Sequence, residues 1–251
     1  MPPKPLSSMI LLRDERLPGE ADVLERITQW WPDLGPIGHV KRIENVLTFD
    51  VDEETLVVSL MPAAIPWADL TGPCSAAWYW PQAGAELRDH AAHLLVVFLS
   101  ADPDRTNASL RFTRLLAALT DCCKAAGVFW GGGGLVHEPA VFIAAARDSS
   151  RQALPLQLWI GYNLRGEEDG THSLYTSGME AFGQMEIEIV HSPSDPKSLY
   201  DRIRDVTHYA LDRNILFKDG DTVGGSEGER IEITEGPSMC DGATTVIQLA
   251  L

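Results

Sequence analysis

The chain has 251 residues, 45% hydrophobic and 22% charged, which is enough for one large domain or two compact halves with a sizeable core. Its 36 Asp and Glu against 20 Lys and Arg give a formal net charge of −16. This charge repels phosphates and anionic lipids at long range, so it argues against nucleic acid or a membrane as the partner. A basic protein partner fits the charge, and so does acidity that only keeps the protein soluble.

The sequence contains few signals for targeting or for redox chemistry. The longest strongly apolar run, residues 94–99, is far shorter than the roughly 20 residues of a membrane-spanning helix, and we expect no signal peptide. The four cysteines form neither a C-x-x-C motif nor a disulfide framework. These features predict a cytoplasmic protein.

Hydrophobic periodicity predicts alternating strands and helices in the first half. Residues 1–8 are Pro-rich and are expected to form a disordered tail. Strands are predicted at 9–12, 47–51, 56–61 and 93–99, and helices at 19–31 and 83–91. The order β-α-β-β-α-β is that of the split βαβ, ferredoxin-like arrangement, in which two helices cover one face of an antiparallel sheet.

The rest of the chain, from Asn107 onward, is also predicted to alternate between helices and strands. A helix beginning at Asn107 and ended by Gly127 leads to further strands at 128–130, 154–160, 185–189, 215–217, 230–234 and 245–249, and to helices at 139–145 and 196–210. We therefore predict an α+β protein of two ferredoxin-like halves, 9–127 and 128–251, with mostly antiparallel sheet, packed as one globular unit. The shared element order suggests a pseudo-duplication, although no residue-level identity supports it.

Four consecutive glycines, 131–134, stand between an aromatic pair and His137-Glu138-Pro139. A phosphate-binding loop would end in Gly-Lys-Ser/Thr, but Leu135-Val136-His137 follows the run. Glycines tolerate positive φ and close backbone approach, so the run predicts a hinge or a close-packing point between the two halves.

His90 and His93 are the strongest candidates for metal ligands. Histidines three residues apart on a helix can converge on one ion, and His137 could add a third ligand if the central loop folds back. If His93 instead begins a strand, the two rings diverge, and the alternative is one hydrogen-bonded core histidine and one surface histidine. The metal-binding hypothesis therefore depends on where the helix ends.

Other segments match a functional motif only in part, because residues that the chemistry needs are missing around them. Gly224-Gly225-Ser226-Glu227-Gly228 matches a nucleophile elbow in letters, but no histidine follows His208 to act as its base. Residues 219–230 resemble a calcium loop, but Val223 and Arg230 stand at ligand positions. Trp67 and residues 78–80 could anchor a partner if exposed or form core if buried. We predict no catalytic residue and no cofactor.

Several segments resemble landmarks of a bacterial family, the domain-of-unknown-function family 4261. They are residues 60–66, 90–96, 127–130, 176–183 followed by Glu186 and Glu188, and 219–224. The resemblance extends over most of the chain and implies no catalytic residues. Domains of this sort occur around bacterial toxin systems, where an acidic cytoplasmic protein would act as an immunity partner.

The leading functional hypothesis is thus a non-enzymatic cytoplasmic binding protein, an immunity-type inhibitor that binds a basic toxin through an acidic face. Exposed loop carboxylates can steer a basic partner, so the predicted contact residues are those of two acidic loops. They are Glu167, Glu168, Asp169, Glu227 and Glu229. The alternatives are a metal-binding domain or hydrolase using the His90/His93 region, and a small-ligand sensor with a cleft between the halves.

Overall fold

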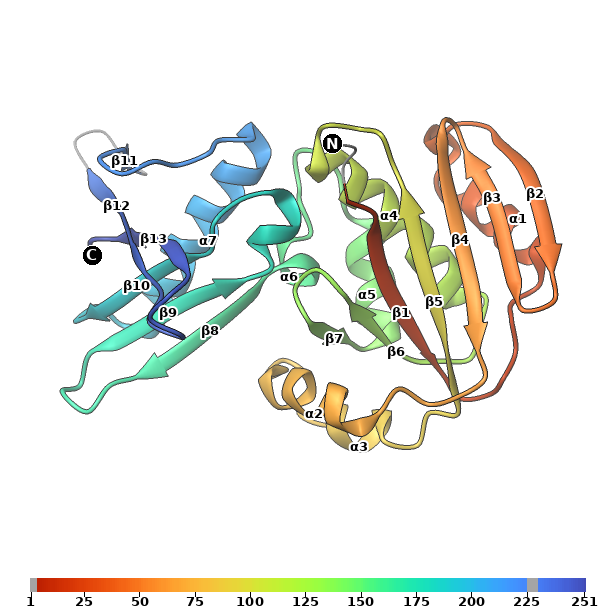
Figure 1. The fold of residues 1–251 in the computed structure, drawn as a ribbon, viewed down its shortest axis with the longest axis horizontal. Helices are drawn as coiled ribbons and strands as arrows, with labels where there is room; N and C mark the ends of the chain where they lie inside the picture. Colours follow the sequence, from red (N-terminus) through yellow and green to blue (C-terminus); the bar gives the residue numbers. More distant parts are fainter. Residues whose placement is uncertain (1–3, 225–229) are drawn as a thin grey trace. The chain divides into compact units, whose positions relative to one another are not determined.

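The chain forms two compact units, Met1–Trp159 and Ile160–Leu251, which we call the N-terminal and C-terminal units. A computed structural model describes residues 4–224 and 230–251 (Figure 1). Both units combine helices with predominantly antiparallel sheet. The predicted α+β class is confirmed.

The N-terminal unit is built on one antiparallel sheet of seven strands in the order β2-β3-β4-β5-β1-β6-β7. The strands are β1 (Leu6–Leu12), β2 (Ile37–Ile43), β3 (Val46–Val51), β4 (Glu54–Met61), β5 (Ala92–Leu99), β6 (Ala125–Trp130) and β7 (Leu135–His137). Burial alternates strictly along β4 and β5, as expected for strands with one face against a core. On that face Leu56, Val58 and Phe98 are fully buried.

Helices cover both faces of this sheet. They are α1 (Glu20–Trp30), η1 (Pro32–Leu34), α2 (Trp67–Ala76), α3 (Ala83–Leu87), α4 (Arg105–Asp121), α5 (Pro139–Arg147) and α6 (Leu156–Trp159). Helix α4 packs on β1 and β6 and contacts α1 and α5. Its core side carries Phe112, which stacks on Phe98 and contacts Trp130, and Trp130 in turn stacks on Trp159. Helices α2 and α3 pack near β6 and β7.

The pairing of β1 differs from a ferredoxin-like half. In a split βαβ unit the first strand lies parallel beside the third, which here would be β4. Instead β1 pairs antiparallel with β5 and β6, while β4 pairs with β3 and β5. Ferredoxin-like halves are therefore not confirmed, and the two sheets do not share a strand order.

The glycine run forms the turn of the β6–β7 hairpin, inside the N-terminal unit. A Cβ on Gly131 would lie 2.5 Å from the Ser7 carbonyl oxygen, and one on Gly133 would lie 2.5 Å from the Trp159 carbonyl oxygen. Gly134 has a φ of +64°. The run is thus a close-packing turn, and the boundary between the units falls at Trp159/Ile160 rather than at the predicted Gly127/Val128.

The predicted tail and some predicted elements also need correction. Strand β1 begins at Leu6, so residues 6–8 belong to the sheet. Helix α4 begins before Asn107, because the Asp104 side chain accepts hydrogen bonds from the backbone N–H groups of Thr106 and Asn107. The predicted strand 154–160 contains the short helix α6, and residues 215–217 form no strand.

The C-terminal unit has a sheet in the order β11-β12-β13-β10-β9-β8. Its strands are β8 (Gly161–Gly166), β9 (His172–Ser177), β10 (Ile187–Ser192), β11 (Thr222–Val223), β12 (Ile231–Pro237) and β13 (Thr245–Leu249), and η2 (Met179–Phe182) precedes β10. All pairings are antiparallel except β10 with β13.

Helix α7 (Pro196–Arg213) supplies the core of this unit by packing on β9 and β10. Pro196 occupies its first turn, and the Asp195 side chain accepts from the backbone N–H groups of Lys197 and Ser198. Its Leu199 and Ile203 are buried, as are Ile187 and Ile189 of β10.

The helices within residues 4–224 and 230–251 include none with the length and apolar character needed to cross a membrane.

Candidate functional site

The β8–β9 hairpin carries one predicted acidic loop at its tip. Glu168 and Asp169 are exposed, whereas Glu167 is half-buried, its Oε2 lying 3.5 Å from Arg165 Nε. Asp169 accepts hydrogen bonds from the Thr171 backbone N–H at 2.9 Å and from the Thr171 hydroxyl at 2.5 Å. These bonds lower the pKa of Asp169, so the tip presents an ionised carboxylate.

The C-terminal unit as a whole is the more acidic part of the chain. Between Ile160 and Leu251 the sequence has 17 Asp and Glu against 7 Lys and Arg, which accounts for −10 of the net charge of −16. The second predicted acidic loop, with Glu227 and Glu229, lies outside the described residues.

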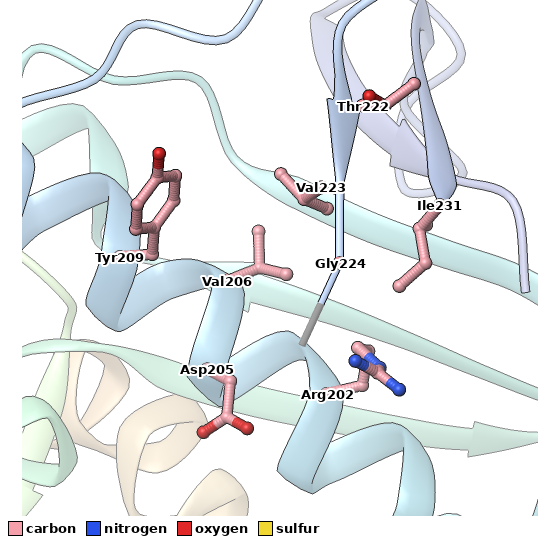
Figure 2. A pocket seen from close by; sticks show the side chains of 8 residues that line it. All are labelled: Arg202, Asp205, Val206, Tyr209, Thr222, Val223, Gly224 and Ile231. Carbon is pink, nitrogen blue, oxygen red and sulfur yellow. The ribbon is translucent and has the colours of Figure 1, made fainter. Parts of the chain in front are cut away.

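A pocket of about 400 Å³ opens between α7 and the β11–β12 hairpin (Figure 2). Val206, Val223 and Ile231 supply apolar surface, and Arg202 and Asp205 place opposite charges on the same stretch of α7. Tyr209 completes the helix side with a half-exposed ring. An apolar side chain of a partner or a small amphipathic molecule suits such a lining.

Asp219 and Asp221, the carboxylates of the segment that resembles a calcium loop, are used in backbone hydrogen bonds. Asp221 accepts from the Lys218 N–H at 2.9 Å, and Asp219 accepts from the Glu235 N–H at 3.1 Å. Both carboxylates therefore stabilise the turn that precedes β11, in agreement with an Asp-Gly turn.

A buried carboxylate in β10 was missed from the sequence as a site residue. Glu188 is 1% exposed, and it accepts hydrogen bonds from the Ser238 hydroxyl at 2.6 Å and the Met239 N–H at 2.9 Å. Ser238 also accepts from the Cys240 N–H at 3.1 Å. Burial raises the pKa of Tyr175, the cross-strand neighbour of Glu188. Alternation with Ile187 and Ile189 predicted a strand with Glu186 and Glu188 on one face, without a site role for either.

His90 is a hydrogen-bonded core residue. Its Nδ1 donates to the Leu87 carbonyl oxygen and its Nε2 accepts from the Ile65 backbone N–H, both at 2.7 Å. Both ring nitrogens are thus occupied, and neither lone pair is available to a metal ion. His93 lies in β5 and donates from Nδ1 to the Ala63 carbonyl oxygen at 2.9 Å.

His137 is likewise part of the core of the N-terminal unit. Its Nε2 donates to the Leu158 carbonyl oxygen at 3.1 Å, and its ring stacks on Tyr79 with centroids 5.8 Å apart. Burial lowers the pKa of His137 to about 4, so the ring is neutral at pH 7. Glu138 is exposed at the start of α5 and makes no side-chain cap.

The structure thus does not assemble the three histidines into a site. Across residues 4–224 and 230–251, no group of three or more His, Cys, Asp or Glu side chains is placed to hold a metal ion.

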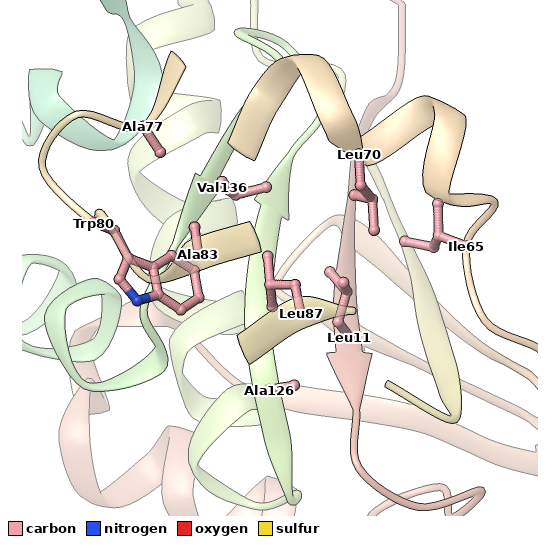
Figure 3. Packing of buried hydrophobic residues seen from close by; sticks show 9 residues of the cluster. All are labelled: Leu11, Ile65, Leu70, Ala77, Trp80, Ala83, Leu87, Ala126 and Val136. Carbon is pink, nitrogen blue, oxygen red and sulfur yellow. The ribbon is translucent and has the colours of Figure 1, made fainter. Parts of the chain in front are cut away.

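The predicted aromatic group divides between core and surface. Trp80 is buried in a cluster that α2 and α3 make with β1, β6 and β7, whose members include Leu11, Leu87 and Val136 (Figure 3). Trp78 is 69% exposed, and the Arg88 guanidinium lies 4.3 Å from the centre of the Trp67 ring. Trp67, Trp78 and Arg88 line a shallow pocket of about 450 Å³.

Residues 175–250 match the model of a family described as Domain of unknown function (DUF4261). The match covers about 30% of the chain. It includes the C-terminal unit from the second half of β9 onward, with Glu188 and the α7 pocket, whereas the N-terminal segments that resemble the family lie outside the match. No curated protein and no solved structure matches the chain significantly.

Proposed function

We propose that this chain is a non-enzymatic binding protein that captures a basic protein partner through the acidic surface of its C-terminal unit. The observation that carries the proposal is the concentration of negative charge in this unit, 17 acidic against 7 basic residues, together with exposed carboxylates on a projecting hairpin. Complementary charge raises the rate of encounter and penalises wrong partners.

The hairpin tip is suited to this role. Hydrogen bonds from Thr171 fix the Asp169 carboxylate in one orientation. Less side-chain conformational entropy is therefore lost when a partner binds. Among residues 4–224 and 230–251, no hydrogen bond of this kind holds the exposed Glu168 beside Asp169. Two adjacent negative charges, one fixed and one adaptable, suit the guanidinium or ammonium group of a basic residue.

The partner we propose is a basic toxin, with the chain acting as its immunity-type inhibitor in the cytoplasm. The support for this narrower proposal is the acidic charge and the resemblance to a family found around toxin systems. Binding alone would suffice for inhibition, so the proposal requires no catalytic residue.

Co-expression with the product of the neighbouring gene tests the proposal through co-purification and rescue from toxicity. Glu168→Lys/Asp169→Asn should weaken the complex by about ten-fold, mainly through slower association, and the loss should shrink at high salt. The control Glu53→Lys/Glu15→Gln makes the same charge change at exposed positions of the N-terminal unit. Absence of a complex and of rescue, or equal losses in both double variants, would contradict the proposal.

A further inference from the structure

In the part of the chain that the structure describes, the two sheets have four edges, and three of them are protected against strand addition. Edge strand β7 has three residues and β11 has two. Edge strand β2 is longer, but its register shifts between Gly38 and Lys41, His39 has a φ of +48°, and Lys41 and Arg42 follow the shift. Short length, bulges and basic residues are the devices by which natural proteins protect sheet edges.

The fourth edge, β8, is neither very short nor bulged. Its six residues pair with β9 in continuous register, and it contains no proline or lysine. Its one charged residue, Arg165, is paired with Glu167. Within residues 4–224 and 230–251, no strand pairs with the other side of β8.

The hairpin geometry identifies which backbone groups face that open side. The Glu167 N–H donates to the Thr171 carbonyl oxygen at 2.9 Å, which makes 167 and 171 a hydrogen-bonded pair. Such pairs alternate along an antiparallel ladder. Tyr162, Leu164 and Gly166 therefore direct their N–H and C=O groups away from β9, and these are the groups that an added strand would use.

The side chains of β8 favour an incoming strand as well. Leu164, at the centre of the strand, is 50% exposed and offers apolar surface to a neighbouring side chain. Tyr162 makes an edge-to-face contact with Tyr200 of α7, with ring centroids 5.2 Å apart, which anchors the start of the strand. The exposed Glu168 and Asp169 stand just beyond its end.

We infer that the free edge of β8 is a strand-addition site for an extended, basic segment of a partner protein. The inference rests on the proposed function, because the acidic tip selects a basic segment whose Lys or Arg side chains reach Glu168 and Asp169. A second copy of this chain is disfavoured as the occupant, since it would bring together two units that each carry −10. Main-chain hydrogen bonds supply affinity in this mode of recognition, and side chains supply specificity.

A first test uses the free protein. Backbone amides of Tyr162, Leu164 and Gly166 should exchange with solvent markedly faster than those of Asn163 and Arg165, which bond to β9. Uniform protection along β8 would overturn the inference, because it would show that the edge is already covered.

The second test measures binding of a ten-residue peptide of alternating lysine and threonine by fluorescence anisotropy. Two twins accompany it, one with glutamate for lysine and one with every backbone nitrogen methylated. Leu164→Pro removes an outward N–H and leaves the β9 ladder intact, whereas Leu164→Ala trims the side chain and keeps the N–H. The lysine peptide should bind about ten-fold more tightly than either twin. Leu164→Pro should lower the affinity for the lysine peptide about ten-fold, and Leu164→Ala should lower it no more than a few-fold.

The outcomes separate this inference from the proposed function. Equal binding to the wild type and Leu164→Pro, with a loss only in Glu168→Lys/Asp169→Asn, would overturn strand addition and leave the acidic surface as the binding site. Equal binding of the methylated twin would do the same, even if Leu164→Pro fails to fold. A dimer in solution that Leu164→Pro abolishes would overturn the choice of occupant. Failure of the lysine peptide to bind at all also overturns strand addition, and the co-expression experiment then decides the proposed function separately.

Discussion

The His137 imidazole illustrates how the surroundings of one residue decide its chemistry. The sequence suggested His137 only as a possible third metal ligand beside His90 and His93. The structure instead encloses the ring between Tyr79 and Phe142 and uses its Nε2–H in a hydrogen bond to Leu158. A buried, neutral histidine of this kind stabilises the fold only while it stays unprotonated.

Stability should therefore fall in mild acid. In the folded state the pKa of His137 is lowered from 6.5 to about 4, so between these values the unfolded chain binds the proton and the folded chain does not. The free energy of unfolding decreases as pH falls through this window, by about 3 kcal/mol in full. Urea denaturation of the wild type and of His137→Gln should show a smaller loss from pH 7 to pH 4.5 in the variant.

His208→Gln, which removes a half-exposed histidine of α7, is the matched control and should retain the wild-type pH dependence. Identical pH dependence in the wild type and His137→Gln would contradict the assignment of this proton uptake to His137.

A largely buried ion pair, in which Glu54 is buried and Arg111 is partly exposed, should contribute strongly to the stability of the N-terminal unit. Arg111 Nε donates to Glu54, Arg111 Nη2 donates to the Leu34 and Val51 carbonyl oxygens, and Ser100 Oγ donates to Glu54 at 2.5 Å. Glu54→Gln leaves the guanidinium without its counter-charge and should lower the free energy of unfolding by about 3 kcal/mol. Chemical denaturation would measure it.

The exposed neighbour Glu53 provides the control, since Glu53→Gln should change stability by no more than about 0.5 kcal/mol. Glu54→Leu/Arg111→Leu should be less destabilised than Glu54→Gln, because it leaves no unpaired charge in the interior. Equal free energies of unfolding for Glu54→Gln and Glu53→Gln would show that the ion pair of Glu54 and Arg111 makes no net contribution.

At the scale of elements, the β6–β7 turn should be intolerant of side chains. The Cβ of Gly131→Ala would meet the Ser7 carbonyl oxygen at 2.5 Å, and backbone atoms cannot move aside cheaply. We expect a loss of about 1 to 3 kcal/mol in thermal or urea denaturation. Gly84→Ala in α3 meets only Trp67 at 4.0 Å and should be neutral or stabilising by about 0.5 kcal/mol. A tolerated Gly131→Ala would refute close packing at this turn.

The elements with a strong burial period were predictable from the sequence. Strands β3, β4 and β5 and helices α1, α5 and α7 were predicted near their observed positions, because each has one face fully buried and a regular apolar repeat. Strand β2 was missed because it is a largely exposed edge strand with no apolar alternation. Residues 154–160 alternate like a strand but are buried except for Gln157, a case in which periodicity cannot distinguish helix from strand.

Pairing between elements was less predictable. The order β-α-β-β-α-β was nearly right for the N-terminal unit, but the position of β1 between β5 and β6 depends on contacts far apart in sequence. Likewise the acidic hairpin was visible as a loop, whereas the open edge of β8 could be recognised only after the sheet order was known. The Glu188 cluster depended on the distant residues Ser238 and Met239.

At the scale of the whole molecule, the division at Trp159/Ile160 predicts separable folding. The C-terminal unit has its own sheet, a long capped helix and a core that includes Ile187, Leu199 and Ile233. A fragment of residues 160–251 should unfold cooperatively on heating and protect the amides of β9, β10 and β13 from exchange. A fragment without a cooperative transition would show that the unit depends on the rest of the chain.

The division into two units also separates most tyrosines of the chain from its tryptophans. All seven tryptophans lie between Met1 and Trp159, whereas four of the five tyrosines follow Ile160. Indole fluorescence therefore reports the N-terminal unit alone, and the closely stacked indoles of Trp130 and Trp159 should add an excitonic signal in circular dichroism that disappears when its core melts. The chain thus carries a built-in spectroscopic label for one unit, and binding at the hairpin of the other can be followed by tyrosine emission or by an added probe.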